Sequence, residues 1–228
     1  ESHVYLYELG AMAAWSGALP RTLRGRNGIL DPADVAAAAA PGPYYMARAR
    51  LLVLENTHNH AGGVVLGIPR KDALIAAARA HGLAVHLDGA RIFHAAEADG
   101  ASPAEEARGF DSVMFCLSKG LGAPAGSLLC GSADLVREAR VVRKRMGGGM
   151  RQAGILAAAG LVALDRHVAR IAEDHARARR LAEALRDLPG FRIEPGEVRT
   201  NIVIAGVEPQ GAEERVLVAV EGVPDLVE

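Results

Sequence analysis

Residues 110–124, FDSVMFCLSKGLGAP, are the most informative stretch of this chain about its architecture. The stretch begins as a short apolar run with the length and composition of a buried strand. It ends abruptly at Ser118 and Lys119, and the small residues and Pro124 that follow cannot continue a strand. Because burial disfavours the ammonium form of a lysine, Lys119 is a candidate nucleophile that can form an imine with an aldehyde. A solvated lysine in a flexible loop is the alternative interpretation.

Apolar runs alternate with helical patterns through residues 50–150. We predict strands at 50–55, 83–87, 110–117 and 127–130, and helices at 71–81, 92–98 and 133–146. This alternation indicates crossover connections and therefore an α/β fold with a mostly parallel sheet. Further strands at 191–194 and 201–205 predict the start of a smaller α/β unit. We expect a large domain over residues 1–188 and an incomplete small domain over 189–228.

Other local patterns predict the ends of elements. Residues 3–7 alternate in polarity like a short strand. Asp31 and Pro32 are typical of a helix start, and Ser102 opens a second helix with a capping-box pattern. Residues 150–188 predict one long helix or two helices in succession.

Polar groups directly follow three of the predicted strands. The segment 56–58 follows the first, Asp88 and Arg91 follow the second, and Lys119 follows the third. Since functional groups gather beyond the carboxyl ends of parallel strands, we expect these groups to converge. An imine-forming lysine, a carboxylate for a pyridine nitrogen and a guanidinium for a carboxylate together suit pyridoxal phosphate (PLP) and an amino-acid substrate. Taken singly, Asp88 is also compatible with a helix cap, and Arg91 with a surface ion pair.

Composition narrows the class of function. Half of the residues are hydrophobic, 23% are charged and the net charge is −1, which gives no electrostatic argument for nucleic acid or an acidic membrane surface. Cys116 and Cys130 fall in predicted core strands without metal-ligand spacing, so we expect free thiols, a reducing compartment and a cytoplasmic location. His58 and His60 lack further ligands at a telling spacing, and no metal site is predicted.

Five passages resemble the low-specificity L-threonine aldolase family of fold type I PLP enzymes. They are HVYLYE at 3–8, LENTHN at 54–59, HLDGARIF at 86–93, CLSKGLGAP at 116–124 and RKRMGGGMRQAG at 143–154. The resemblance runs from the first residue to about Val203. It implies a three-layer α/β/α large domain, PLP as cofactor, and retro-aldol cleavage of L-threonine and L-allo-threonine to glycine and an aldehyde.

The resemblance also implies roles for individual residues. Lys119 would be the cofactor lysine, Asp88 the partner of the pyridine nitrogen, and His3 the side chain that stacks on the cofactor ring. Arg91 would bind the substrate carboxylate. His58 would lie near the substrate β-hydroxyl and guide removal of its proton.

A basic cluster contributes two more candidates. The resemblance places Lys144, for substrate, and Arg151, for cofactor, at or near the active site, where they reach a neighbouring subunit of a homotetramer. Basic clusters of this kind also form solvated helix faces. His94 stands where the family usually has Asn.

The family's phosphate-binding turn precedes its histidine passage and is absent from residues 1–228, so we expect this chain to be a segment of a longer protein. Two alternatives stay open. Another fold type I activity, such as β-elimination, racemisation or hydroxymethyl transfer, would use the same Lys119 and Asp88. A truncated, non-catalytic relative is the second alternative.

Overall fold

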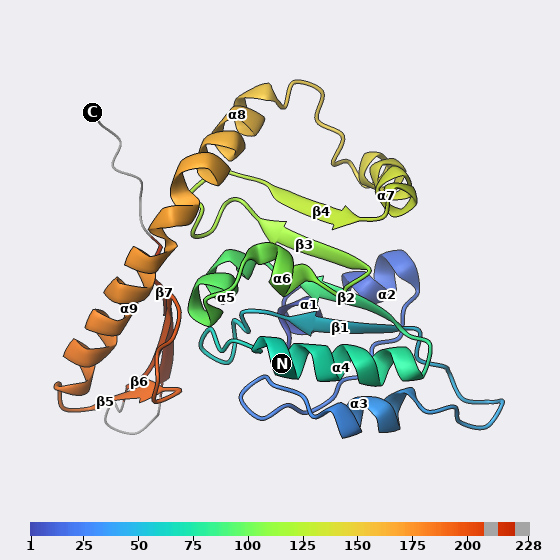
Figure 1. Ribbon diagram of the computed structural model, residues 1–228, viewed down its shortest axis with the longest axis horizontal. Coiled ribbons are helices and arrows are strands. Elements are labelled where there is room, and N and C mark those ends of the chain that lie inside the picture. Colours follow the sequence, from blue (N-terminus) through green and yellow to red (C-terminus); the bar gives the residue numbers. More distant parts are fainter. Residues whose placement is uncertain (208–213, 222–228) are drawn as a thin grey trace.

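The computed structural model describes residues 1–207 and 214–221. It contains a four-stranded sheet with the order β1-β2-β3-β4 and a three-stranded sheet with the order β5-β6-β7 (Figure 1). The strands of the first sheet are β1 (Leu51–Glu55), β2 (Ala84–Asp88), β3 (Ser112–Cys116) and β4 (Ser127–Gly131). β1, β2 and β3 are parallel, and β4 runs antiparallel to β3. The predicted α/β fold with a mostly parallel sheet is confirmed.

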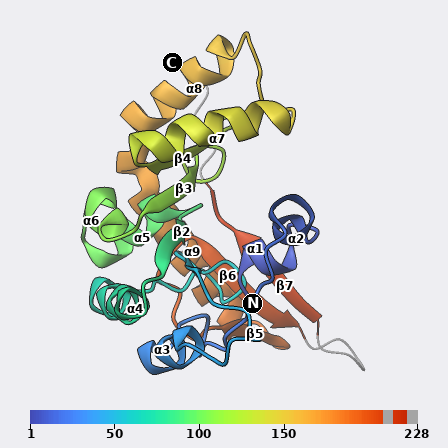
Figure 2. The same cartoon turned by 90° about the vertical axis from the view of Figure 1, so that its right-hand side faces the viewer.

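Helices cover both faces of the first sheet. Figure 2 shows α4, α5 and α6 on one side and α1 and α2 on the other, and α3 packs against α4. Their bounds are α1 (His3–Leu6), α2 (Ala11–Ser16), α3 (Pro32–Ala39), α4 (Ile68–Ala80), α5 (Ile92–Asp99) and α6 (Pro103–Ala107). The core between sheet and helices is built from aliphatic side chains such as Leu54, Leu74, Val85 and Leu87. Burying these side chains is the main stabilising contribution to this layer.

The structure contains the two helix starts predicted at Asp31 and Ser102. It does not contain the strand predicted at residues 3–7. The Asp31 carboxylate accepts the Ala33 N–H at 2.9 Å, and Ser102 forms both bonds of its capping box. Residues 3–7, predicted as a strand, form the short helix α1 instead. The amides of Tyr5 and Leu6 both donate to the Ser2 carbonyl at 3.1 Å. Five alternating residues cannot form a strand unless a neighbouring strand takes their hydrogen bonds.

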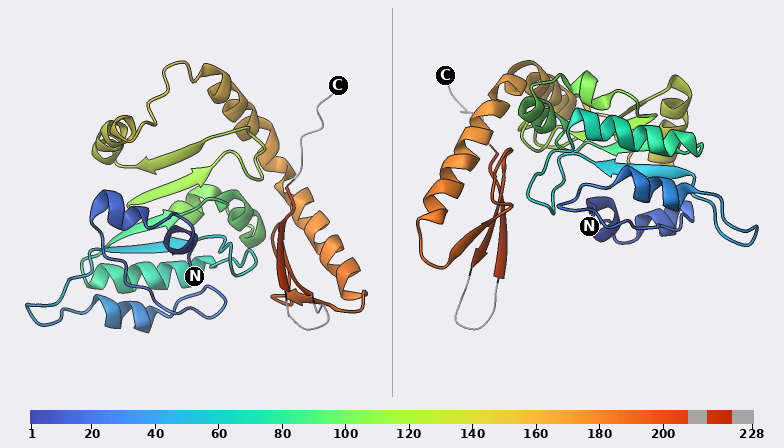
Figure 3. Two further views of the ribbon diagram at one scale, coloured as in Figure 1. Left: turned by 180° about the vertical axis from the view of Figure 1, so that it is seen from behind. Right: turned by 60° about the horizontal axis from the view of Figure 1, so that its bottom comes forward.

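The second half of the chain is largely helical before it reaches the second sheet. It contains α7 (Ala133–Arg145), α8 (Gly154–Val162) and α9 (Ile171–Arg186), with a π turn and a 3-10 turn joining α8 to α9. The three strands that follow are β5 (Phe191–Glu194), β6 (Ile202–Val207) and β7 (Glu214–Ala219). Figure 3 shows α9 lying along this sheet, where Ala178 and Ala182 pack against Ile193 and Val203. The domain boundary at residue 188 stays a prediction, and residues 208–213 and 222–228 of the expected small domain lie outside the described residues.

The two cysteines are free thiols in different surroundings. Cys116 is half-buried on β3, whereas Cys130 is exposed on β4. The prediction that both lie in the core is wrong for Cys130, because every residue of β4 is exposed. Among the residues that the structure describes, no helix has both the length and the apolar character needed to cross a bilayer.

Candidate active site

The ends of three parallel strands meet at one edge of the first sheet. In the β1–β2 ladder Glu55 is the partner of Asp88, and in the β2–β3 ladder Asp88 is the partner of Met114. The segments that leave these strands therefore start side by side. They carry His58, Arg91 and Lys119, so the topology gathers the groups that the sequence placed at strand ends.

The loop that carries Lys119 is fixed by the side chains on either side of it. Leu117 and Leu121 are buried in one apolar cluster with Ile171 of α9, while Lys119 itself is half-buried. Gly120 lies against His94, and a Cβ at this glycine would come 2.1 Å from His94 Nε2. Only glycine leaves room for that ring. The apolar anchors and the small residue together hold Lys119 at the end of β3.

Asp88 is surrounded by charged groups. Burial raises the pKa of its carboxyl, and the neighbouring Glu55 carboxylate raises it further. The Ala90 N–H, which donates to Asp88 at 3.3 Å, acts in the opposite direction, as do the positive charge of Lys119 and that of His3 when its ring is protonated. Asp88 is therefore a carboxyl group whose ionised form would be favoured further by an additional cation.

Arg91 is buried and already binds a carboxylate. One terminal nitrogen donates to Asn59 Oδ1 at 3.1 Å, and the other donates to Glu221 Oε1 at 3.1 Å. The Nε atom of Arg91 and the hydroxyl of Thr57 are buried without a hydrogen-bond partner among the described residues. The guanidinium is thus oriented to receive a carboxylate, and Glu221 already binds one of its two terminal nitrogens.

His58 is buried, and its surroundings determine where its proton lies. Burial lowers the pKa of the ring, although the nearby Glu55 carboxylate opposes that shift. The Ala61 N–H donates to His58 Nδ1 at 3.3 Å, which places the single proton of the neutral ring on Nε2. His58 therefore presents a hydrogen-bond donor rather than a free lone pair.

His3 has the opposite arrangement. Its Nδ1 lies 3.0 Å from Glu8 Oε1, so the proton of the neutral ring lies on Nδ1 and Nε2 keeps its lone pair. The backbone N–H of His3 donates to Glu55 Oε2 at 2.7 Å, which attaches α1 to the end of β1. Of the two neutral rings, His3 is the one whose lone pair lies on Nε2.

The remaining candidates lie elsewhere in this chain. Lys144 is exposed in the last turn of α7, and Arg151 is exposed in the segment that follows. α7 follows the antiparallel strand β4, so it begins at the opposite end of the sheet from the ends of β1, β2 and β3 (Figure 1). Within residues 1–207 and 214–221, no group of three or more His, Cys, Asp or Glu side chains could hold a metal ion. His60, for which the sequence predicts no role as a metal ligand, bonds to the Tyr7 hydroxyl at 3.2 Å.

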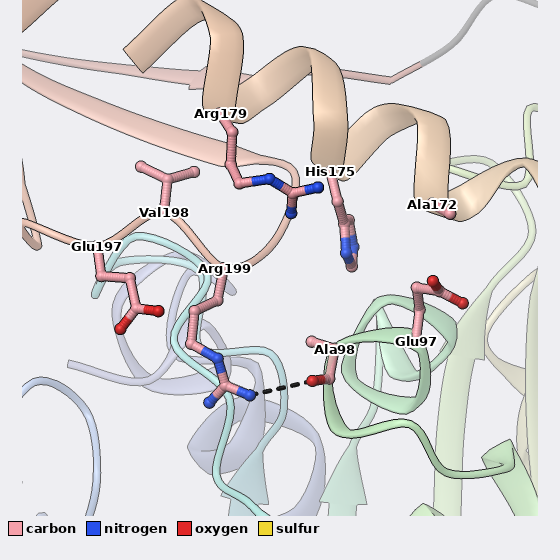
Figure 4. Close-up of a pocket in the computed structure, with 8 residues that line it drawn as sticks. All are labelled: Glu97, Ala98, Ala172, His175, Arg179, Glu197, Val198 and Arg199. Carbon is pink, nitrogen blue, oxygen red and sulfur yellow. Dashed lines mark hydrogen bonds between the residues drawn. The ribbon is translucent and has the colours of Figure 1, made fainter. Parts of the chain in front are cut away.

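A shallow cavity of about 300 Å³ lies between α5, α9 and the segment before β6. His175 and Arg179 of α9 face Glu97 and Arg199 across it (Figure 4). None of the candidate site residues lines this cavity. Behind it, His175 Nε2 meets His94 Nδ1 at 3.0 Å in a buried pair of stacked rings. This pair joins α9 to the helix that supports the Lys119 loop.

A family model described as Beta-eliminating lyase matches residues 1–208. The chain belongs to this family. Beta-eliminating lyase relatives of this chain include low-specificity L-threonine aldolase 1 of Arabidopsis thaliana, 39% identical over 90% of the chain and 58% of the relative. The low specificity L-threonine aldolase of Escherichia coli O157:H7 is 47% identical over 82% of the chain and 55% of the relative. The predicted resemblance is confirmed, although the chain spans less than two thirds of the length of these relatives.

A solved structure shares the fold of this chain. The structure of a putative L-allo-threonine aldolase from Listeria monocytogenes EGD-E matches with a TM-score of 0.80 and 23% sequence identity. The match covers 91% of this chain and 56% of that one. The α/β fold is therefore shared with that protein.

Proposed function

We propose that this chain belongs to a PLP-dependent aldolase that cleaves L-threonine and L-allo-threonine to glycine and an aldehyde. The observation that carries the proposal is the convergence of Lys119, Asp88 and Arg91 at the ends of the neighbouring strands β2 and β3, beside the end of β1. The similarity to low-specificity L-threonine aldolases over most of the chain supports the choice of substrate.

The side chains at this edge fit PLP. When bound, PLP supplies an aldehyde that joins an amine and a pyridine ring that accepts the electrons of a breaking bond. Lys119 Nζ is the amine that would hold the aldehyde. Asp88 would accept a hydrogen bond from the protonated pyridine nitrogen, and the positive charge of that nitrogen would counteract the raised pKa of Asp88.

Arg91 would orient the substrate. Its guanidinium matches a carboxylate in shape and charge, and its buried Nε remains available as a donor. Because Glu221 bonds to one terminal nitrogen, an amino acid would bind by replacing that carboxylate. Asn59, which holds the other terminal nitrogen, would keep the guanidinium in place during the exchange.

Two histidines would handle the proton of the substrate β-hydroxyl. His58 Nε2–H would donate a hydrogen bond to the hydroxyl oxygen or to a water molecule beside it. His3 would lie on the face of the cofactor ring, and its Nε2 is the nitrogen that can accept a proton while Nδ1 is held by Glu8. The division between donor and acceptor follows from the hydrogen bonds that each ring already makes.

We also propose that the protein acts as a homo-oligomer, with a tetramer expected from the resemblance. Lys144 and Arg151 are exposed on this chain and would approach the substrate and the cofactor of a neighbouring subunit. Leu128 and Leu129 of β4 are exposed apolar side chains, and their burial would favour association.

The test is product analysis with the purified protein. With PLP and either threonine diastereomer, we expect acetaldehyde and glycine in equal amounts. Lys119→Ala should lower the rate by roughly a thousandfold or more, because no other lysine is placed at the strand ends. Arg108→Ala, which changes an exposed cation, is the matched control and should leave the rate unchanged.

The same measurement separates this proposal from other reactions of the family. β-Elimination, which the family description names, would release ammonia and a keto acid instead of glycine. Racemisation would change only the configuration at Cα, and hydroxymethyl transfer would require a one-carbon acceptor. Failure to form acetaldehyde from either diastereomer, while one of these products accumulates, would reject the aldolase assignment.

A further inference from the structure

Glu55 lies beside Asp88 at the edge of the sheet, and neither the predicted strand that it ends nor the resemblance assigns it a role. It ends β1, is half-buried, and pairs with Asp88 in the sheet ladder. Register partners on parallel strands point their side chains to the same face, so the two carboxylates are neighbours. Among the charges that act on Asp88, Glu55 has the largest effect.

Each oxygen of this carboxylate accepts a backbone N–H from a different segment. Oε2 accepts from His3, 52 residues earlier, at 2.7 Å. Oε1 accepts from Asn59 at 2.8 Å. Hydrogen bonds to an ionised acceptor are about twice as strong as those between neutral groups. Glu55 therefore joins two segments that carry candidate site residues.

This attachment supports both segments. α1 has only four residues and none of them is buried, so apolar packing contributes little to its position. The loop after β1 carries His58 and also Asn59, whose side chain holds the Arg91 guanidinium. Loss of the Glu55 carboxylate would remove the hydrogen bond that holds the His3 backbone. It would also free the backbone of Asn59, whose side chain orients Arg91.

We propose that Glu55 is a positioning residue of this site. Its carboxylate fixes α1 and the loop that carries His58 to the end of β1, and it adds a second negative charge beside Asp88. The second part rests on the proposed function, because that charge favours a cationic ring nitrogen such as the protonated pyridine of PLP. The anchoring part does not depend on the cofactor.

Hydrogen exchange on the cofactor-free protein tests the anchoring. In Glu55→Ala, peptides covering residues 2–5 and 57–61 should exchange about tenfold faster or more, because both amides lose their acceptor. Glu138→Ala, which removes an exposed carboxylate on α7, should leave both peptides unchanged. Unchanged exchange in Glu55→Ala would overturn the anchoring role.

Carboxyl-carbon NMR tests the electrostatic role. The titration midpoint of Asp88 should move to lower pH in Glu55→Gln, and it should return toward the wild-type midpoint in Glu55→Asp. After loading with PLP, Glu55→Gln should lower kcat more than it changes KM. An unmoved Asp88 midpoint would overturn this part of the proposal.

The two proposals fail in different ways. If the wild-type protein with PLP shows no visible absorbance band that depends on Lys119, the proposed function is wrong, and the exchange and NMR measurements still decide the role of Glu55. If the band is present but exchange and titration do not respond to Glu55 substitution, the inference about Glu55 is wrong while the proposed function stands.

Discussion

Replacing Gly120 with alanine should destabilise the protein by forcing a side chain into the support of Lys119. The new Cβ would lie 2.1 Å from His94 Nε2 and 3.2 Å from Ile171 Cδ1. Non-bonded carbon atoms in a core prefer separations of about 3.5–4.0 Å, so the first contact is a severe overlap. His94 cannot move aside easily, because it is buried and bonded to His175.

The magnitude follows from two opposing effects. Overpacking a tight site costs about 1–3 kcal/mol. Alanine also restricts the unfolded chain more than glycine does, which stabilises the folded state by about 0.4–1 kcal/mol. Gly120 does not adopt a positive φ, so no backbone strain adds to the cost. We expect a net loss of about 1–2 kcal/mol, which corresponds to a fall in Tm of about 2–8 °C for a chain of this size.

Urea denaturation measures this loss, and a matched substitution controls for the change in residue type. Gly154 also lacks a positive φ, and a Cβ there would meet nothing within 4 Å. Gly154→Ala should therefore leave stability unchanged or slightly higher. In the Gly120→Ala and His94→Ala double mutant, the two losses should be less than additive by about 1 kcal/mol or more. Equal midpoints for the two glycine variants, or strict additivity, would refute the steric argument.

Three further substitutions test other contacts. Glu221→Gln removes the charge that competes for Arg91, so the KM for an amino-acid substrate should fall about threefold to tenfold; an unchanged KM would contradict this competition. Burial and nearby Asp99 raise the pKa of Glu106 to about 7, so stability that is present at low pH is lost as the pH rises through about 7. Urea midpoints at about pH 5 and about pH 8 should differ less in Glu106→Gln than in the wild type, since glutamine stays neutral. Burial lowers the pKa of His94 to about 3. The stability that this neutral ring contributes is present above about pH 6.5 and is lost as the pH falls from there to about 3. His94→Asn should reduce this acid sensitivity, and an equal fall in the variant would show that His94 is not its source.

The sequence predicted the strand-end candidates because their signals are local. Lys119 and Asp88 each lie at the end of a short apolar run, where polar or small residues begin. A short apolar run with such a boundary is typical of a buried strand. The alternation of strands and helices then placed both at one edge of a parallel sheet. The same local logic predicted the capped helix starts at Asp31 and Ser102.

Contacts between distant segments were not predictable in this way. The bond from Glu55 to the His3 amide spans 52 residues, and that from Arg91 to Glu221 spans 130. Local periodicity predicts helices and strands, but it does not predict which segments far apart in the sequence contact one another. The alternation at residues 3–7 was misleading for a related reason, because a strand is defined by its neighbour and the helix α1 satisfies its amides locally.

The charges at the strand ends would also favour a cationic ligand over a neutral one. Glu55 and Asp88 are adjacent carboxylates, and the raised pKa of Asp88 reflects their repulsion as well as burial. A protonated ring nitrogen beside Asp88 would relieve that repulsion and favour the ionised carboxylate. Binding and ionisation of Asp88 would then reinforce each other, since a ligand that prefers the ionised form shifts the protonation equilibrium toward it. A neutral ring at the same place would gain none of this stabilisation, so the carboxylate pair would select the protonated state of the heterocycle proposed to bind there.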